Sequence, residues 1–118
     1  MTTVLIVEDE PLIRLISAEI LGDAGYRVLE ADGAGQALEV LQRDGDIDLL
    51  FTDIRMPGLM DGLKLAETVH ERWPAVHLLV TSGHIRLSDN DLPDAGTFLP
   101  KPYRSQDLID RVAWIFRH

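Results

Sequence analysis

Short apolar runs alternate along the chain with longer stretches in which apolar residues recur at helical spacing. The first run, residues 4–7, is continuous, which is typical of a strand buried on both faces of a sheet. Residues 11–21 follow with the periodicity of an amphipathic helix. The predicted inward face of this helix consists of Ile13, Ile16, Ser17, Ile20 and Leu21.

The same alternation continues to the C-terminus. Alternating strands and helices favour an α/β fold, in which helices cover both faces of a parallel sheet. We expect residues 1–118 to form one domain, because the chain shows no linker and no change in composition. The further predicted strands are residues 27–31, 48–52, 77–81 and 97–99, and the further helices are residues 35–42, 63–72 and 105–116, the last capped by Ser105.

The weakest helical pattern lies between the fourth and fifth strands. Residues 85–96 contain few apolar side chains, and the run Asp89-Asn90-Asp91 suits a helix interior poorly. Pro93 also disfavours helical backbone at the residue before it. We therefore expect a short or irregular helix there, and we expect this segment to be the part that changes between functional states.

Composition and charge narrow the class of protein. The hydrophobic fraction of 46% and the charged fraction of 26% are those of an ordinary folded domain. A net charge of −9 argues against direct binding of nucleic acid. The chain has no cysteine, no signal-peptide pattern and no apolar run of membrane-spanning length, and its four histidines are dispersed. These features favour a cytoplasmic location and exclude disulfides and thiolate metal sites.

Polar residues follow the predicted strands. Glu8, Asp9 and Glu10 follow the first strand, Asp53 the third, and Lys101 the fifth. The carboxyl ends of parallel strands form the edge at which such sheets bind ligands. We therefore expect these side chains to converge there, together with the residues that follow the fourth strand, Thr81, Ser82 and Gly83.

This set of groups suits phosphoryl transfer. Clustered carboxylates repel one another, and Mg²⁺ would relieve that repulsion while retaining open positions for phosphate oxygens. A carboxylate can act as a nucleophile toward phosphorus. Lys101 could neutralise the transferred group, and Ser82 could donate a hydrogen bond to it.

Each residue taken alone also has an ordinary structural interpretation. Asp9 or Glu10 before Pro11 could simply begin a helix, and Asp53 could be a turn residue. Lys101 could be a solvated lysine at a turn, and the pair Asp61-Gly62 could be a turn and helix start. Only the ordered combination favours the functional interpretation.

Four motifs in order resemble the receiver domains of bacterial two-component response regulators, and the resemblance covers essentially the whole chain. It implies a flavodoxin-like (βα)₅ fold with strand order 2-1-3-4-5, and a phosphoacceptor signalling domain rather than an enzyme with a separate substrate. The motifs are Val4-Leu5-Ile6-Val7-Glu8-Asp9-Glu10-Pro11, Asp53-Ile54-Arg55-Met56-Pro57-Gly58, Thr81-Ser82-Gly83 and Phe98-Leu99-Pro100-Lys101-Pro102-Tyr103.

The resemblance also implies a role for each matching position. Asp53 would accept the phosphoryl group, and Lys101 would contact it. Ser82 would be the switch hydroxyl, with Phe98 the aromatic residue that follows it. The bond between Lys101 and Pro102 would be cis. Mg²⁺ would be held by Asp9, Asp53 and the backbone carbonyl of Arg55, with Glu8 acting through water.

The partner implied by the resemblance is a sensor histidine kinase or a histidine phosphotransfer protein. In this family the first helix meets the kinase, and Leu12 and Leu15 lie off its predicted inward face. We therefore predict that both leucines are exposed and contact the partner. Pro102 and Tyr103, next to Lys101, are further candidates for partner contact.

The chain departs from the family pattern in three places. Glu8 stands where aspartate is commoner, the loop of residues 56–62 is one residue longer than usual, and residues 82–101 form a shorter segment than usual. Shortened segments of this kind are similar to those of proteobacterial receivers associated with HWE-type kinases.

Two other functions stay open at this point. A flavodoxin-like module that binds FMN or a nucleotide would need a Ser-, Thr- or Gly-rich phosphate loop after the first strand, where this chain has Glu8-Asp9-Glu10. A receiver that binds partners without being phosphorylated would keep the same fold.

Overall fold

A computed structural model describes residues 1–55, 60–83, 87, 91–93 and 96–117. In these residues, five parallel strands form one sheet with the order β2-β1-β3-β4-β5. The predicted flavodoxin-like order is therefore confirmed. The strands are β1 (Thr3–Val7), β2 (Arg27–Ala31), β3 (Leu49–Asp53), β4 (His77–Ser82) and β5 (Gly96–Pro100).

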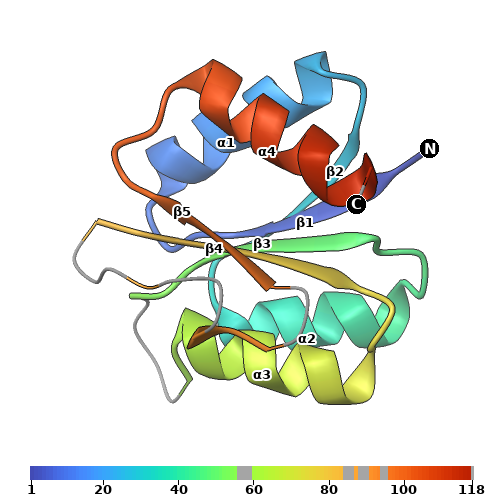
Figure 1. Cartoon of the computed structure of the whole chain (residues 1–118). Helices are drawn as coiled ribbons and strands as arrows, with labels where there is room; N and C mark the ends of the chain where they lie inside the picture. The colour runs from blue at the N-terminus through green and yellow to red at the C-terminus, as the bar shows by residue number, and fades with distance from the viewer. Residues whose placement is uncertain (56–59, 84–86, 88–90, 94–95, 118) are drawn as a thin grey trace.

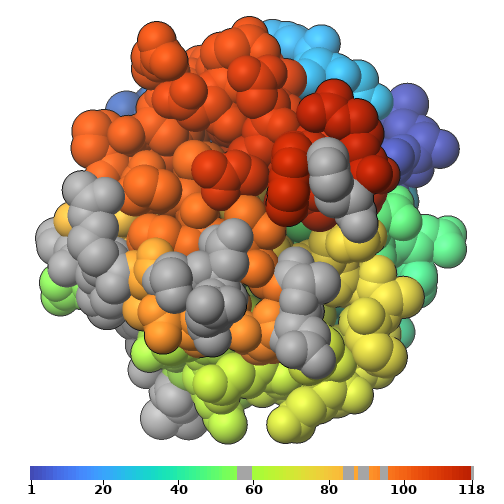
Figure 2. Space-filling view, in the orientation of Figure 1, coloured from blue at the N-terminus to red at the C-terminus, as the bar shows by residue number. Residues whose placement is uncertain are grey.

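Helices cover both faces of the sheet. Figure 1 shows α1 and α4 on one face and α2 and α3 on the other, which confirms the three-layer arrangement. In the same orientation, the space-filling view shows the surface of α4 above that of α3 (Figure 2). The helices are α1 (Pro11–Asp23), α2 (Ala34–Arg43), α3 (Gly62–Arg72) and α4 (Ser105–Arg117).

The core consists of two layers separated by the sheet. In β1, Val4 and Ile6 pack toward α1 and α4, whereas Leu5 and Val7 pack toward α2 and α3. All five residues of this strand are buried, as the continuous apolar run predicts. The alternation of faces along a strand therefore assigns every strand residue to one layer or the other.

Local signals set the ends of the helices. Pro11 occupies the first turn of α1, and the Asp61 side chain caps α3 by accepting a hydrogen bond of 2.8 Å from the Lys64 backbone N–H. Ser105 was expected to cap the last helix, but it is the first residue within α4. The carboxylate of Asp107 instead accepts a hydrogen bond of 2.9 Å from the backbone N–H of Arg104.

Helix α1 matches the predicted inward face at four of its five positions, since Ser17 and Leu21 are buried and Ile13 and Ile20 are partly buried. Ile16 is 47% exposed, so its predicted burial is wrong, whereas Leu12 and Leu15 are exposed as predicted. Two polar residues also contribute to the packing of this helix. Arg14 Nη1 donates to the backbone oxygen of Glu8 at 2.7 Å, and Ser17 is buried.

The segment expected to hold a short or irregular helix, residues 85–96, lies mostly outside the described residues. Of its described members, Leu87 and Leu92 pack against the layer that contains α2 and α3. Among the described residues, no helix has both the length and the apolar character needed to cross a membrane.

Candidate functional site

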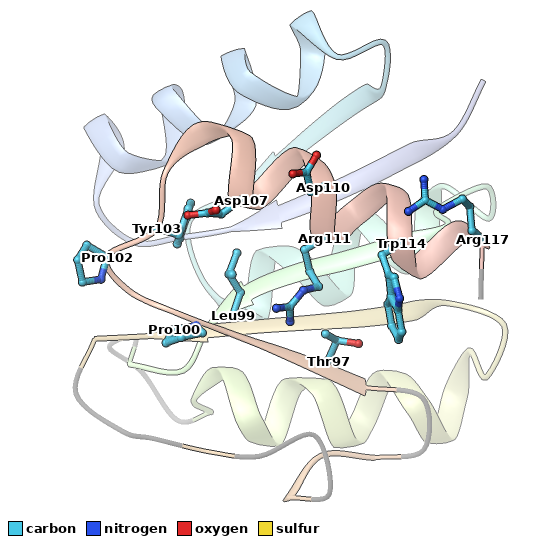
Figure 3. A pocket seen from close by; sticks show the side chains of 10 residues that line it. All are labelled: Thr97, Leu99, Pro100, Pro102, Tyr103, Asp107, Asp110, Arg111, Trp114 and Arg117. Atoms are coloured by element: carbon cyan, nitrogen blue, oxygen red, sulfur yellow. The ribbon is translucent and has the colours of Figure 1, made fainter.

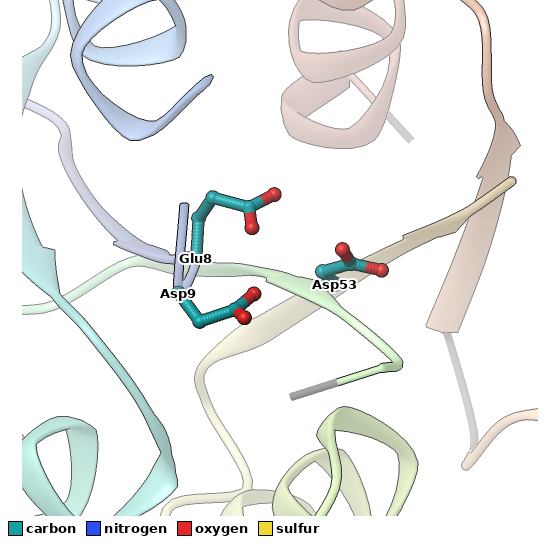
Figure 4. A group of neighbouring side chains, drawn as sticks. All are labelled: Glu8, Asp9 and Asp53. Atoms are coloured by element: carbon teal, nitrogen blue, oxygen red, sulfur yellow. The ribbon is translucent and has the colours of Figure 1, made fainter. Parts of the chain in front are cut away.

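Three carboxylates meet where β1 and β3 end. Glu8 and Asp9 follow β1, and Asp53 is the last residue of β3. Each offers an oxygen that lies within 4.8 Å of the others, and Figure 4 shows the three side chains extending into a common space. Such a set of oxygen donors fits a hard divalent cation such as Mg²⁺. For Glu8, Asp9 and Asp53 the convergence predicted from the sequence is present, whereas Glu10 is exposed and is not one of the three clustered carboxylates.

Lys101 reaches the same place from the end of β5. Its Nζ lies 3.0 Å from Asp53 Oδ2 and 3.3 Å from Glu8 Oε1. Its backbone N–H donates to the carbonyl of Ser82 at 3.0 Å, and the peptide bond to Pro102 is cis, as the resemblance implied. The side chains of Glu8 and Asp53 are only 6% and 11% exposed, so water screens these ion pairs weakly.

Burial and neighbouring charges act on the ionisation of these groups. Burial raises the pKa of Glu8, while the N–H of Glu10 and the charge of Lys101 oppose that rise. Burial by itself would lower the pKa of Lys101. The hydrogen bond and the charge of Asp53, together with Glu8, outweigh burial and raise the pKa of Lys101. Lys101 is therefore held as a cation beside Asp53.

Backbone contacts fix the acidic turn after β1. The N–H of Glu10 donates to Glu8 Oε2 at 3.2 Å, and the N–H of Glu8 donates to the carbonyl of Ala31 at 3.1 Å. Arg14, from α1, donates to the carbonyl of Glu8 and also forms an ion pair with Glu30 at 3.4 Å. The orientation of Glu8 is therefore set by both α1 and β2.

Gly62 is required by the backbone of the site. Its N–H donates to the carbonyl of Ile54 at 2.8 Å. A Cβ atom at this position would overlap the carbonyl oxygen of Asp53, which also accepts a hydrogen bond from Thr52 Oγ1 at 2.9 Å. Asp61-Gly62 is thus a helix start, as expected. Gly62 also packs directly against the backbone at the end of β3.

The alternation of faces places Thr81, and not Ser82, on the side of the sheet that holds Asp53. Phe51 and Leu79 pack toward α1 and α4, and Asp53 and Thr81 each follow them by two residues. Asp53 and Thr81 are also register partners. Among the described residues, Thr81 Oγ1 is buried without a hydrogen-bond partner. The sequence places Thr81 at this edge of the sheet, but the resemblance assigned the switch role to its neighbour Ser82.

Other predicted positions lie around this centre. Phe98 is 6% exposed and packs in the layer of α2 and α3, and Arg55 is exposed just beyond β3. Pro102 is exposed and Tyr103 is partly buried. Of the longer loop predicted at residues 56–62, residues 56–59 lie outside the described residues.

Two hollows border the site. A cavity of about 10 Å³ lies under Asp53, with Glu8, Ser17, Thr81 and Tyr103 among its lining residues. A much larger cleft of about 860 Å³ runs along α4 and β5 (Figure 3). Tyr103 lines both. Glu8, Asp9 and Asp53 do not line the larger cleft, so its size does not make it the chemical site.

Comparison with known proteins gives one consistent family. Residues 4–113 match the sequence model of the response regulator receiver domain. The response regulator receiver protein CpdR of Brucella abortus is 33% identical over 95% of this chain and 94% of its own length. The sensor kinase CckA of Brucella abortus is 34% identical over 93% of this chain, but the match spans only 12% of that kinase. The structure of a response regulator receiver protein from Sinorhizobium medicae is 31% identical, with a TM-score of 0.88 over 98% of this chain and 94% of that one.

Proposed function

The chain belongs to the response regulator receiver domain family of two-component systems, and on that premise we propose that Asp53 accepts a phosphoryl group from a histidine kinase or a histidine phosphotransfer protein. The observation that carries the proposal is the position of Asp53, which lies 3.0 Å from the Lys101 ammonium and within 4.8 Å of two other carboxylates.

The transfer is a displacement at phosphorus. A carboxylate oxygen of Asp53 attacks the phosphorus atom, the bond from phosphorus to the donor nitrogen breaks, and its electron pair stays on the departing imidazole. Lys101 Nζ, already beside Asp53 Oδ2, contacts an oxygen of the incoming group and balances its negative charge. The product is an aspartyl phosphate on Asp53.

The acidic residues fit the magnesium ion that this family uses. Asp9, Asp53 and the backbone carbonyl of Arg55 are the proposed ligands, and Glu8 is proposed to act through water. When bound, Mg²⁺ supplies positive charge against the phosphoryl oxygens. Glu8 and Asp53 are ion-paired with Lys101, so the carboxylates keep a fixed arrangement before the cation arrives.

A hydroxyl is proposed to complete the site. Thr81 is favoured, because its Oγ1 is buried on the face of Asp53 and has no partner within the described part of the chain. The assignment of this switch role to Ser82 stays a prediction. Phe98 is proposed to change its packing when the hydroxyl moves toward the phosphoryl group, which would shift the population between two states.

The proposed output is a change of shape rather than turnover of a substrate. Residues 1–118 are proposed to act as one receiver domain in the cytoplasm, where ATP supplies histidine kinases with phosphoryl groups. The relation to HWE-type kinases stays a prediction. Leu12 and Leu15 are the proposed kinase contacts on α1, and Pro102 with Tyr103 the proposed contacts beside the site.

Mass spectrometry after incubation with acetyl phosphate and Mg²⁺ tests the proposal. The protein should gain one phosphoryl group, and the gain should disappear in Asp53→Asn and on removal of Mg²⁺. Asp46→Asn, in the exposed loop before β3, is the matched control and should gain the group normally. Normal phosphorylation of Asp53→Asn would contradict the assignment. A wild-type protein that gains no phosphoryl group from acetyl phosphate or from a phosphorylated histidine kinase would favour a receiver that acts only by binding.

A further inference from the structure

Tyr103 contacts both helix α1 and the sheet. Its ring meets the ring of Phe51 edge-on, with centroids 6.2 Å apart and an interplanar angle of 61°. Its hydroxyl forms a hydrogen bond with Ser17 of α1. Because Tyr103 follows Lys101 by two residues, these contacts anchor the chain just after the lysine that reaches Asp53.

The buried hydroxyl of Ser17 needs a hydrogen-bond partner. It is 4% exposed in a helix position that would otherwise be apolar. A buried hydroxyl without a hydrogen bond is costly, and Tyr103 supplies that bond. Burial raises the pKa of Tyr103, while the hydrogen bond with Ser17 opposes the rise. The phenol therefore stays neutral and keeps the proton that a hydrogen bond between two hydroxyls requires.

The space between this pair and the site is nearly filled. The cavity bordered by Ser17, Tyr103, Asp53 and Glu8 measures about 10 Å³, which is room for about one water molecule. Close-packed side chains transmit small displacements to their neighbours. A shift of Tyr103 toward or away from α1 would therefore move the turn that carries Lys101.

We propose that Tyr103 is a positioning residue for phosphoryl transfer. Held by Ser17 and Phe51, it fixes the turn after Lys101 so that Nζ lies between Asp53 and Glu8. This inference rests on the proposed phosphorylation of Asp53. It gives Tyr103 a role in positioning Lys101 in addition to the partner contact expected from the sequence. Tyr103 also lines the large cleft along α4 and β5 (Figure 3).

Tyr103→Phe removes the hydroxyl and keeps the ring. We expect it to slow phosphorylation by acetyl phosphate at saturating Mg²⁺ by about three- to tenfold, the range set by the loss of one hydrogen bond. Ser17→Ala should slow the reaction by a similar factor. Tyr26→Phe is the matched control, because Tyr26 packs against Phe116 away from the site, and it should react at the wild-type rate. Circular dichroism of each variant reports whether the fold is retained.

Two double variants separate positioning from a general effect on structure. If Tyr103 acts through Lys101, Tyr103→Phe should add little further slowing in a Lys101→Ala background, and Ser17→Ala should add little to Tyr103→Phe. A Tyr103→Phe variant that reacts as fast as wild type would overturn the proposal. The same slowing factor with and without Lys101 would overturn it as well. Failure of the wild-type protein to accept a phosphoryl group would instead count against the proposed function.

Discussion

The hydroxyl of Thr81 and the carboxylate of Asp53 lie on the same side of the sheet, near the carboxyl ends of neighbouring strands. Asp53 has Lys101 as its ionic partner, whereas Thr81 Oγ1 is buried without a partner among the described residues. A buried hydroxyl without a hydrogen bond costs free energy in the unmodified protein, and under the proposed function it would gain a partner in a phosphoryl oxygen on Asp53. On that proposal, the Thr81 hydroxyl would favour the phosphorylated state.

Thr81→Val tests this role because valine keeps the shape and removes the hydroxyl. We expect phosphorylation by acetyl phosphate to slow by about ten- to a hundredfold, the range for loss of a hydrogen bond to a charged group. The free energy of unfolding should not fall, since the hydroxyl has no partner in the described structure. Stopped reactions followed by mass spectrometry and urea unfolding measure the two quantities.

Ser82→Ala is the companion variant. Ser82 lies one residue further along β4, so its side chain points to the face opposite Thr81. It should react within about twofold of wild type, as expected for a side chain that does not touch the transferred group. The reverse outcome, a slow Ser82→Ala and a normal Thr81→Val, would return the switch role to Ser82.

The residue-level difference between expectation and structure has a simple physical origin. The motif Thr81-Ser82-Gly83 contains two adjacent hydroxyls, and composition alone does not separate them. The alternation of side chains along a strand does separate them. Thr81 lies two residues after Leu79 and therefore faces the same side of the sheet, toward α1 and α4. The pair Ser17–Tyr103 could not be found in this way, since its members are far apart in sequence and meet only in the folded protein.

At the scale of elements, the strands were the most predictable part. Buried parallel strands are short continuous apolar runs, so their positions and the convergence of Asp9, Asp53 and Lys101 follow from the sequence. Helix α1 was less predictable. Its apolar periodicity placed Ile16 on the inward face, whereas Ile16 is exposed beside Leu12 and Leu15. The hydrophobic pattern also carries no information on polar contacts such as the hydrogen bond from Arg14 to the carbonyl of Glu8.

Helix α1 therefore presents an exposed apolar surface formed by Leu12, Leu15 and Ile16, which are 68%, 50% and 47% exposed. Changing Leu12 and Leu15 to serine should slow phosphotransfer from the cognate kinase by about tenfold, which corresponds to a joint contribution of about 1.4 kcal/mol from two side chains at the centre of an interface. Phosphorylation by acetyl phosphate should stay unchanged. Radiolabel transfer from the phosphorylated kinase measures the first reaction, and mass spectrometry the second.

Trp114→Ser supplies a control for the loss of an exposed hydrophobic side chain, because Trp114 is 43% exposed on α4 instead of α1. It should react normally with both donors. Equal loss of both reactions in the Leu12 and Leu15 variant would indicate damage to the fold. Normal transfer from the kinase would remove this surface from the interface.

At the scale of the whole molecule, charge opposes the compact state. The chain has a net charge of −9, and three of its carboxylates lie within 4.8 Å of one another. Lys101 pairs with two of them, which leaves Asp9 without an ion pair to that lysine. Like charges this close destabilise the fold, so a cation bound at the site should stabilise the entire domain.

Mg²⁺ should therefore raise the free energy of unfolding even without a phosphoryl donor. At a concentration one hundred times its dissociation constant, a ligand that binds only the folded state adds about 2.7 kcal/mol. Urea unfolding in a magnesium titration measures this gain. Asp53→Asn should be more stable than wild type without Mg²⁺, since one of the repelling charges is gone, and should gain much less from the cation.

General screening of the acidic surface must be separated from binding at the site. Sodium chloride at matched ionic strength screens exposed charges but offers no divalent ligand, so it should give only a small part of the gain. Asp46→Asn removes the same charge as Asp53→Asn but from an exposed loop, and should keep the full response to Mg²⁺. If sodium chloride reproduced the effect, or if Asp53→Asn responded as wild type does, the three carboxylates would not form the magnesium site. The carboxylates at the ends of β1 and β3 would then only repel one another. Lys101 would have to supply the positive charge that phosphoryl transfer requires.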